Sequence, residues 1–235
     1  MLAVSHLTKI YHKTPANNDI SFSAEPGQVT ILLGPNGAGK STAIKCIMGL
    51  LRYRGEITVC GKPNKTLEAK AALGYVPEVP SLYDLLTVGE HMELMARAYR
   101  LTGYEAYAQE LLERFELKDK ESKLARELSK GMQQKVSICC ALLHRPKIVV
   151  FDEPLVGLDP HAIKEIKKTF SELRGEGRSV LISTHIIDSV QDIWDKAVIL
   201  SQGSILRELT REQAEAEGVS LEDAFFRLTE RDGDN

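Results

Sequence analysis

Residues 34 to 41 read GPNGAGKS and fit the pattern G-x-x-x-x-G-K-[ST]. Glycines at such positions let backbone N–H groups turn inward around phosphate oxygens. Lys40 would contact the β- and γ-phosphates of a nucleotide, the Ser41 hydroxyl would bind Mg²⁺, and Thr42 would support the loop from the next helical position. An ordinary glycine-rich turn is the alternative, and the completely filled pattern argues against it. The predicted phosphate-binding residues are Gly34, Pro35, Asn36, Gly37, Ala38, Gly39, Lys40, Ser41 and Thr42.

Two neighbouring carboxylates follow a run of four apolar residues in IVVFDE. Asp152 would hold Mg²⁺ through water, and Glu153 could polarise a water molecule that attacks the γ-phosphate. Ligands of open α/β sheets bind at the C-terminal ends of the strands, which is where this run places both groups. A simple acidic turn explains the pair equally well on its own. The phosphate loop upstream makes the catalytic interpretation the better one.

His185 ends a second apolar run, SVLISTH, and could help to orient the water at the γ-phosphate. A lone histidine after a strand is more often a solvated loop residue, so only its position after the carboxylates favours a catalytic role. Farther upstream, LSKGMQQKV resembles the start of a helix that can hold an anion. Ser129 suits the N-cap and Gly131 permits close approach, although a plain capped helix fits equally well.

The elements that must position these residues predict an α/β fold. Alternating runs near residues 2–11 and 19–28 indicate antiparallel strands, and VTILLG indicates a strand buried on both faces that leads into the phosphate loop. Between about residues 80 and 145 three helical patterns replace the strands. The pattern therefore predicts one domain over residues 1–235, with a helical subdomain inserted at about 80–145.

The composition is that of an ordinary globular protein: 27% charged, 43% hydrophobic and a net charge of −3. This balance argues against a protein built mainly to hold nucleic acid. We find neither an apolar run of bilayer length nor a signal-peptide pattern, and we expect a cytoplasmic protein that reaches a membrane only through another chain. Cys46, Cys60, Cys139 and Cys140 lack metal-ligand spacing and are interpreted as small core residues.

Taken in this order, the four motifs resemble the ATP-binding subunits of ABC transporters, over nearly the whole chain. The resemblance implies a P-loop NTPase core with a mostly parallel sheet, an antiparallel β subdomain on the N-terminal side and the inserted helical subdomain. It also implies ATP and Mg²⁺ as cofactors and two ATPase domains packed head to tail, as a homodimer or a heterodimer. ATP would lie between the phosphate loop of one domain and the signature of the other, and hydrolysis would drive integral membrane permease subunits at the inner face of the cell membrane.

The resemblance also assigns roles to further residues. The signature residues that would hold the partner's ATP are Ser129, Lys130, Gly131 and Met132. Asp159, in the segment of residues 157–159 called the D-loop, would link the two sites. Tyr11 matches the position that stacks on adenine, with packing of a strand tyrosine as the alternative. Glu78 stands where the family usually has a glutamine that contacts Mg²⁺ and water. A glutamate can still bind Mg²⁺, and the alternative is that Glu78 faces the permease.

Two departures from the family pattern concern the signature, commonly Leu-Ser-Gly-Gly-Gln. Lys130 adds a positive charge beside a phosphate, and Met132 removes an amide. These variants and the ending SLEDAFFRLTER are similar to a bacterial export-type subgroup. A soluble ABC ATPase that acts on ribosomes or DNA is the alternative function, disfavoured by the single motif set. An ATP sensor without hydrolysis is disfavoured because the chain has all the catalytic groups, namely Lys40, Asp152, Glu153 and His185.

Overall fold

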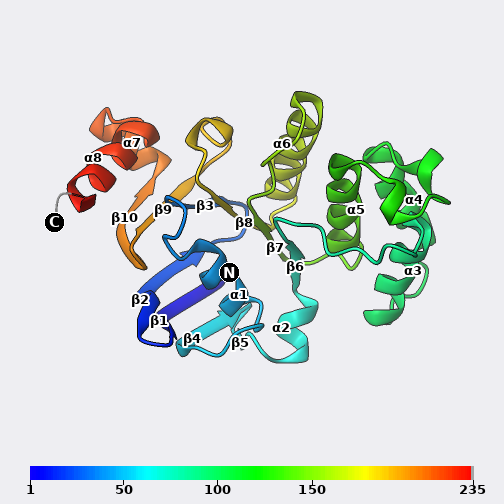
Figure 1. Cartoon of the computed structure of the whole chain (residues 1–235), viewed down its shortest axis with the longest axis horizontal. Helices are drawn as coiled ribbons and strands as arrows, with labels where there is room; N and C mark the ends of the chain where they lie inside the picture. Colours follow the sequence, from blue (N-terminus) through cyan, green and yellow to red (C-terminus); the bar gives the residue numbers. More distant parts are fainter. Residues whose placement is uncertain (234–235) are drawn as a thin grey trace.

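The computed structural model describes residues 1–233, which form two β-sheets and the helices around them (Figure 1). The first sheet is antiparallel and has four strands in the order β2-β1-β4-β5. Its strands are β1 (Leu2–Tyr11), β2 (Thr14–Ala24), β4 (Arg54–Val59) and β5 (Lys62–Pro63). The prediction of antiparallel strands near the N-terminus is thus confirmed.

The second sheet has six strands in the order β10-β9-β3-β8-β7-β6, all parallel except β10 at one edge. They are β3 (Val29–Leu33), β6 (Leu73–Val76), β7 (Ile148–Asp152), β8 (Ser179–Thr184), β9 (Lys196–Ser201) and β10 (Ser204–Thr210). Leu32 packs toward the first sheet, whereas its neighbours Ile31 and Leu33 pack into a separate core on the opposite face. Both faces are buried, as the continuous apolar runs predict.

The helices are α1 (Lys40–Ile47), α2 (Leu67–Ala71), α3 (Val88–Ala98), α4 (Glu105–Arg114), α5 (Lys130–Leu142), α6 (Pro160–Gly175), α7 (Arg211–Glu217) and α8 (Leu221–Gly233). Helices α3 to α5 come between β6 and β7 in the chain and lie together at one end of the molecule (Figure 1). They occupy the range of the predicted helical insert. Residues 234 and 235 of the predicted single domain lie outside the described residues.

Local sequence explains where the helices that carry the site begin. Ser129 is the N-cap of α5, where its hydroxyl accepts a hydrogen bond from the Met132 N–H at 3.3 Å. Asp159 caps α6 in the same way, with Pro160 at the first helical position. These two helix starts place the predicted signature and the D-loop at the ends of rigid elements.

Three sequence interpretations differ from the structure. The sequence after His185 predicts a helix in which Trp194 packs. Trp194 is buried, but it follows a short 3₁₀ turn over residues 187–189 and does not lie in a helix. Cys60 is exposed at the turn after β4, whereas the other three cysteines are buried. The sequence patterns predict neither of the short helices α2 and α7, although a capping box at Thr210 and Gln213 marks the start of α7.

Candidate functional site

A cavity of about 460 Å³ opens where β3, β7 and β8 end. It is lined by Ala16, Asn36, Gly37, Gly39, Lys40, Ser41, Thr42, Glu78, Glu153, Val156 and His185. The loop after β3 supplies most of this lining, and the segments after β6, β7 and β8 supply the acidic side chains and the histidine. Parallel strands that end at one edge thus bring together groups that are up to about 150 residues apart in sequence.

Lys40 lies at the centre of the charged groups and is 5% exposed. Its ammonium donates hydrogen bonds to the carbonyl oxygens of Gly34 at 2.7 Å and Pro35 at 3.1 Å. It also lies 3.4 Å from Oε1 of Glu153. The charge is therefore held at the mouth of the loop, in the position from which a lysine of this loop type reaches phosphate oxygens.

The loop is packed tightly against strand β2. Gly39 has φ = +102°, and a Cβ there would lie 2.2 Å from the carbonyl oxygen of Ala16. The Asn17 amide donates a hydrogen bond to the Gly39 carbonyl at 3.2 Å, and Asn17 is fully buried. Only glycine fits this close approach, so the strand of the first sheet determines the path of the phosphate loop.

Asp152 ends β7 and faces two hydroxyl groups. Its Oδ1 accepts hydrogen bonds from Ser41 Oγ at 3.1 Å and from Ser183 Oγ at 2.5 Å. Serine and aspartate oxygens are hard donors, which Mg²⁺ prefers. This donor set fits the predicted metal ligands Ser41 and Asp152.

Ser183 was not among the predicted site residues, because a serine inside an apolar strand has no distinctive spacing. Its hydroxyl contacts both acidic residues: it donates to Asp152 and accepts from the Glu153 N–H at 3.0 Å. Ser183 is fully buried. It therefore positions the two carboxylates relative to each other.

Glu153 is 7% exposed and has φ = +46°, a left-handed conformation that costs a non-glycine residue about 1–3 kcal/mol. Its Oε1 lies 3.0 Å from His185 Nδ1, and its Oε2 is buried without a hydrogen-bond partner. The strained turn aims the carboxylate at Lys40 and His185. A buried acceptor without a partner is what a water-activating group requires.

The remaining predicted loop residues frame the cavity. Gly34 and Pro35 supply the carbonyl groups that hold Lys40, and Ala38 is buried beneath the loop. Glu78 lies in the cavity wall, and its contact with Mg²⁺ stays a prediction. Tyr11 is 43% exposed at the end of β1, with the Lys9 ammonium 4.8 Å from its ring centre. It does not belong to the cavity lining within the described residues, and adenine stacking stays a prediction.

The signature residues lie outside this cavity. Lys130 extends over the D-loop, because a Cβ at Gly157 would lie 2.8 Å from Lys130 Nζ. A Cβ at Gly131 would lie 4.0 Å from Asp159 Oδ2. Ser129 is exposed, whereas Met132 packs against the core. The signature and the D-loop of one chain therefore form one surface, separate from the phosphate loop.

Asp159 is anchored on that surface by the helix it caps. The Ala162 N–H donates to its Oδ1 at 3.0 Å, and this hydrogen bond holds the pKa of the Asp159 carboxyl below its usual value. Asp159 is therefore a fixed negative charge near neutral pH.

The family described as ABC transporter matches residues 17–156, which include the phosphate loop, the start of α5 and strand β7. The chain belongs to the ABC transporter family. This ABC transporter chain is 38% identical to the ABC-type transporter ATP-binding protein EcsA of Bacillus subtilis, over 99% of its own length and 98% of that protein. It is 35% identical to the Nod factor export ATP-binding protein I of Rhizobium meliloti, over 87% of its length and 63% of the relative.

Solved structures agree with the fold of the ABC transporter chain. An ATP-binding subunit of an ABC transporter superposes with a TM-score of 0.91 and 36% identity, over 97% of this chain and 99% of the other. A dimeric bacterial ABC transporter cassette superposes with a TM-score of 0.81 and 27% identity, over 89% and 98% of the two chains. The predicted α/β P-loop fold is therefore confirmed. None of the helices within residues 1–233 is long and apolar enough to cross a membrane.

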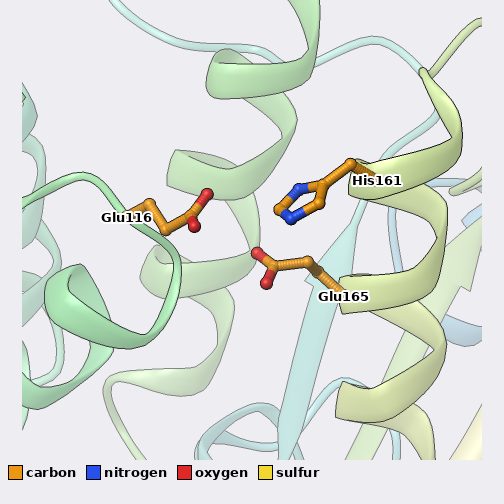
Figure 2. Close-up of side chains that lie close together, drawn as sticks. All are labelled: Glu116, His161 and Glu165. Carbon is orange, nitrogen blue, oxygen red and sulfur yellow. The ribbon is translucent and has the colours of Figure 1, made fainter.

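A second cluster of titratable groups in the ABC transporter chain joins the helical segment to α6. Figure 2 shows His161 and Glu165 of α6 facing Glu116, which follows α4. The ammonium of Lys135 on α5 lies 3.1 Å from Glu116 Oε2 and 3.2 Å from Glu165 Oε2. Because a lysine already supplies the positive charge between the carboxylates, we interpret the cluster as an ion-pair bridge and propose no metal there.

Replacing the bridging lysine should lower stability. Lys135→Met keeps the apolar stem but leaves Glu116 and Glu165 facing each other without a cation. The Lys135 side chain is only 10% exposed and the carboxylates are 60% and 26% exposed, so we expect a loss of about 1–3 kcal/mol. Urea denaturation measures it, with Lys164→Met on the exposed face of α6 as the control. If Lys135→Met and Lys164→Met are equally stable, the ion pairs of Lys135 do not stabilise the fold.

Proposed function

We propose that this chain binds ATP with Mg²⁺ and hydrolyses it as the energy-supplying subunit of an ABC exporter. One observation carries the proposal. At the cavity, Oε1 of Glu153 lies 3.4 Å from the Lys40 ammonium and 3.0 Å from Nδ1 of His185. A cation for the phosphate, a carboxylate for the water and a histidine beside that carboxylate are the groups that phosphoryl transfer to water requires.

The position of each residue in the cavity indicates its role in the proposed reaction. Backbone N–H groups of the loop and the Lys40 ammonium would hold the β- and γ-phosphates. Ser41 and Asp152 would bind Mg²⁺, whose chemistry is to neutralise charge that builds up on the phosphate oxygens. Glu78, in the cavity wall, would contribute a further oxygen on the same side.

Glu153 would accept the proton of the attacking water. Its Oε2 lacks a hydrogen-bond partner and Oε1 is held by His185, so one oxygen is oriented while the other can receive the proton. Ser183 would keep the carboxylate in place through the Glu153 backbone. His185 would orient the water or the γ-phosphate from the end of β8.

The family pattern places the signature, at the start of α5, against the bound ATP. Within the described residues, however, no signature residue lines the cavity of its own chain. We infer that a second ATPase domain supplies Ser129 and Gly131 in trans, at the helix N-terminus of α5. Three features support this inference: the signature lies outside the cavity, it shares a surface with the D-loop, and a related cassette has been solved as a dimer.

A separate membrane permease is the proposed receiver of the energy, which places the chain at the inner face of the membrane. An apolar groove of about 520 Å³ between β6 and the helical segment is lined by Leu82, Tyr83, Leu94 and Met95, among others. Tyr83 and Leu94 keep 64% and 39% of their surface exposed. Ser81, Leu82 and Tyr83, in the segment between β6 and α3, contribute to this groove. The export direction is supported by the Nod factor export relative.

Co-expression of the tagged chain with its permease tests the proposal. The two should co-purify, and the complex should hydrolyse ATP with Mg²⁺ and stop when EDTA removes the metal, because Ser41 and Asp152 would then lose the ion that neutralises the phosphates. A complex that forms but never cleaves ATP would reject the chemical part. If the chain hydrolyses ATP but never co-purifies with the permease, the proposal that a permease is its partner is rejected.

A further inference from the structure

The positive charge of this chain is concentrated in its first third. Residues 1–73 hold nine Lys and Arg against four Asp and Glu, whereas the remaining residues hold 21 against 29. Lys40 belongs to the cavity. The other eight form no salt bridge with a carboxylate within the described residues, and all but Lys9 are exposed. They are Lys9, Lys13, Lys45, Arg52, Arg54, Lys62, Lys65 and Lys70.

Two exposed leucines stand among these cations. Leu67 is 82% exposed and Leu50 is 65% exposed, whereas a leucine of this chain is ordinarily buried. We define the cationic patch as Leu50, Arg52, Lys65, Leu67 and Lys70. Leu67 and Lys70 are three residues apart on α2, so their side chains share one face of that helix.

The patch is held together by hydrogen bonds beneath it. The buried Asn64 donates to the carbonyl oxygens of Cys46 and Ile47, both at 2.8 Å, and so ties the end of α1 to the segment before α2. Lys65 lies 5.1 Å from the ring centre of Tyr53. A Cβ at Gly49 would lie 3.7 Å from Lys65 Cγ, so the chain beside Leu50 is adjacent to Lys65. These contacts place the chain beside Leu50 next to Lys65, just before α2 with Leu67 and Lys70, and Arg52 adjoins Tyr53 in sequence.

We propose that the cationic patch docks on the surface of a membrane that contains anionic phospholipids. Unpaired lysine and arginine attract anionic headgroups, and flanking leucines can enter the boundary between headgroups and acyl chains. The most exposed apolar side chains among these cations are Leu67 and Leu50, whereas the Tyr53 ring beside Lys65 is half-buried, which favours lipid over stacked bases. The exposed Glu68 on α2 is the opposing charge nearest in sequence.

The position of the patch fits this partner. Leu50 and the neighbouring Lys45 also line the apolar groove that we propose for the permease. A permease seated there would bring the cationic patch toward the same bilayer. This inference goes beyond the proposed function and uses it only for this orientation, since lipid binding requires neither ATP nor hydrolysis.

Vesicle sedimentation of the purified chain tests the inference. We expect binding to vesicles of phosphatidylcholine mixed with phosphatidylglycerol, much weaker binding to phosphatidylcholine alone, and loss of binding as salt is raised. The triple variant Arg52→Gln, Lys65→Gln, Lys70→Gln should bind the anionic vesicles about tenfold more weakly or worse. Leu50→Ser with Leu67→Ser should also weaken binding, without changing its salt dependence.

The matched control removes the same charge elsewhere. Arg126→Gln, Lys123→Gln and Lys164→Gln replace one exposed arginine and two exposed lysines that form no salt bridge within the described residues. This control should bind as the unchanged chain does, and ATP hydrolysis should be retained in both triple variants. Equal binding to neutral and anionic vesicles, or an equal loss in the control, would overturn the proposal. Binding to single-stranded RNA with the same dependence on Arg52, Lys65 and Lys70, without vesicle binding, would overturn it in favour of nucleic acid.

Discussion

Glu153→Gln lowers the rate of ATP hydrolysis by about 10²–10⁴-fold while ATP still binds, if Glu153 accepts the proton of the attacking water. The amide has the size of the carboxylate but cannot take up that proton. The variant also removes the negative charge that lies 3.4 Å from the Lys40 ammonium. Without this neighbouring charge, the ammonium attracts phosphate more strongly than in the unchanged chain. Bound ATP should therefore accumulate, and with it the ATP-bound pair of chains.

Phosphate release and size-exclusion chromatography with ATP measure these two effects on the same sample. Glu56→Gln is the control, since it removes one negative charge from an exposed position on β4 that forms no salt bridge within residues 1–233. It should hydrolyse ATP as the unchanged chain does. An unchanged rate in Glu153→Gln would reject Glu153 as the base.

Ser129→Asp should abolish most hydrolysis without unfolding α5. Aspartate is as good an N-cap as serine, so the hydrogen bond to the Met132 N–H is preserved. Its charge, however, would face the γ-phosphate held by the other chain. Loss of one such anion donor costs about 10²–10³-fold in rate, and repulsion adds to that loss. Ser129→Arg blocks the same position by size.

Two controls separate this effect from a loss of structure. Ser122→Arg places the same bulk on an exposed serine of the helical segment and should leave the rate unchanged. ATP binding to monomeric Ser129→Asp should also persist, because the signature lies outside the cavity formed by its own chain. Normal hydrolysis by Ser129→Asp would show that Ser129 is only a helix cap.

Much of this arrangement follows from the sequence because strands buried on both faces appear as unbroken apolar runs. VTILL and IVVF predicted β3 and β7, and therefore the edge at which Lys40, Asp152 and Glu153 meet. Ser183 could not be found in this way, because its role depends on a neighbouring strand rather than on spacing. The left-handed turn at Glu153 is likewise a tertiary result, since it is maintained by hydrogen bonds from its N–H to Ser183.

Some of the remaining features could have been predicted from the sequence, whereas others depend on the folded structure. The Thr210 to Gln213 capping box could have revealed α7. The segment that contains Trp194 was predicted to be helical, whereas the structure has turns before Trp194, which packs into the core. The electrostatic asymmetry of the first third is invisible in a net charge of −3, and the exposure of Leu50 and Leu67 appears only in the fold.

The central claim is that each ATP site is completed by the signature of a second chain, and one mixing experiment tests it. Lys40→Ala and Ser129→Asp should each be inactive alone. In a mixed pair, one site carries both defects and the other carries neither, because its phosphate loop and its signature come from different chains. Random pairing of equal amounts therefore predicts recovery of about a quarter of the normal ATP hydrolysis. No recovery in pairs shown to have formed would contradict the shared site.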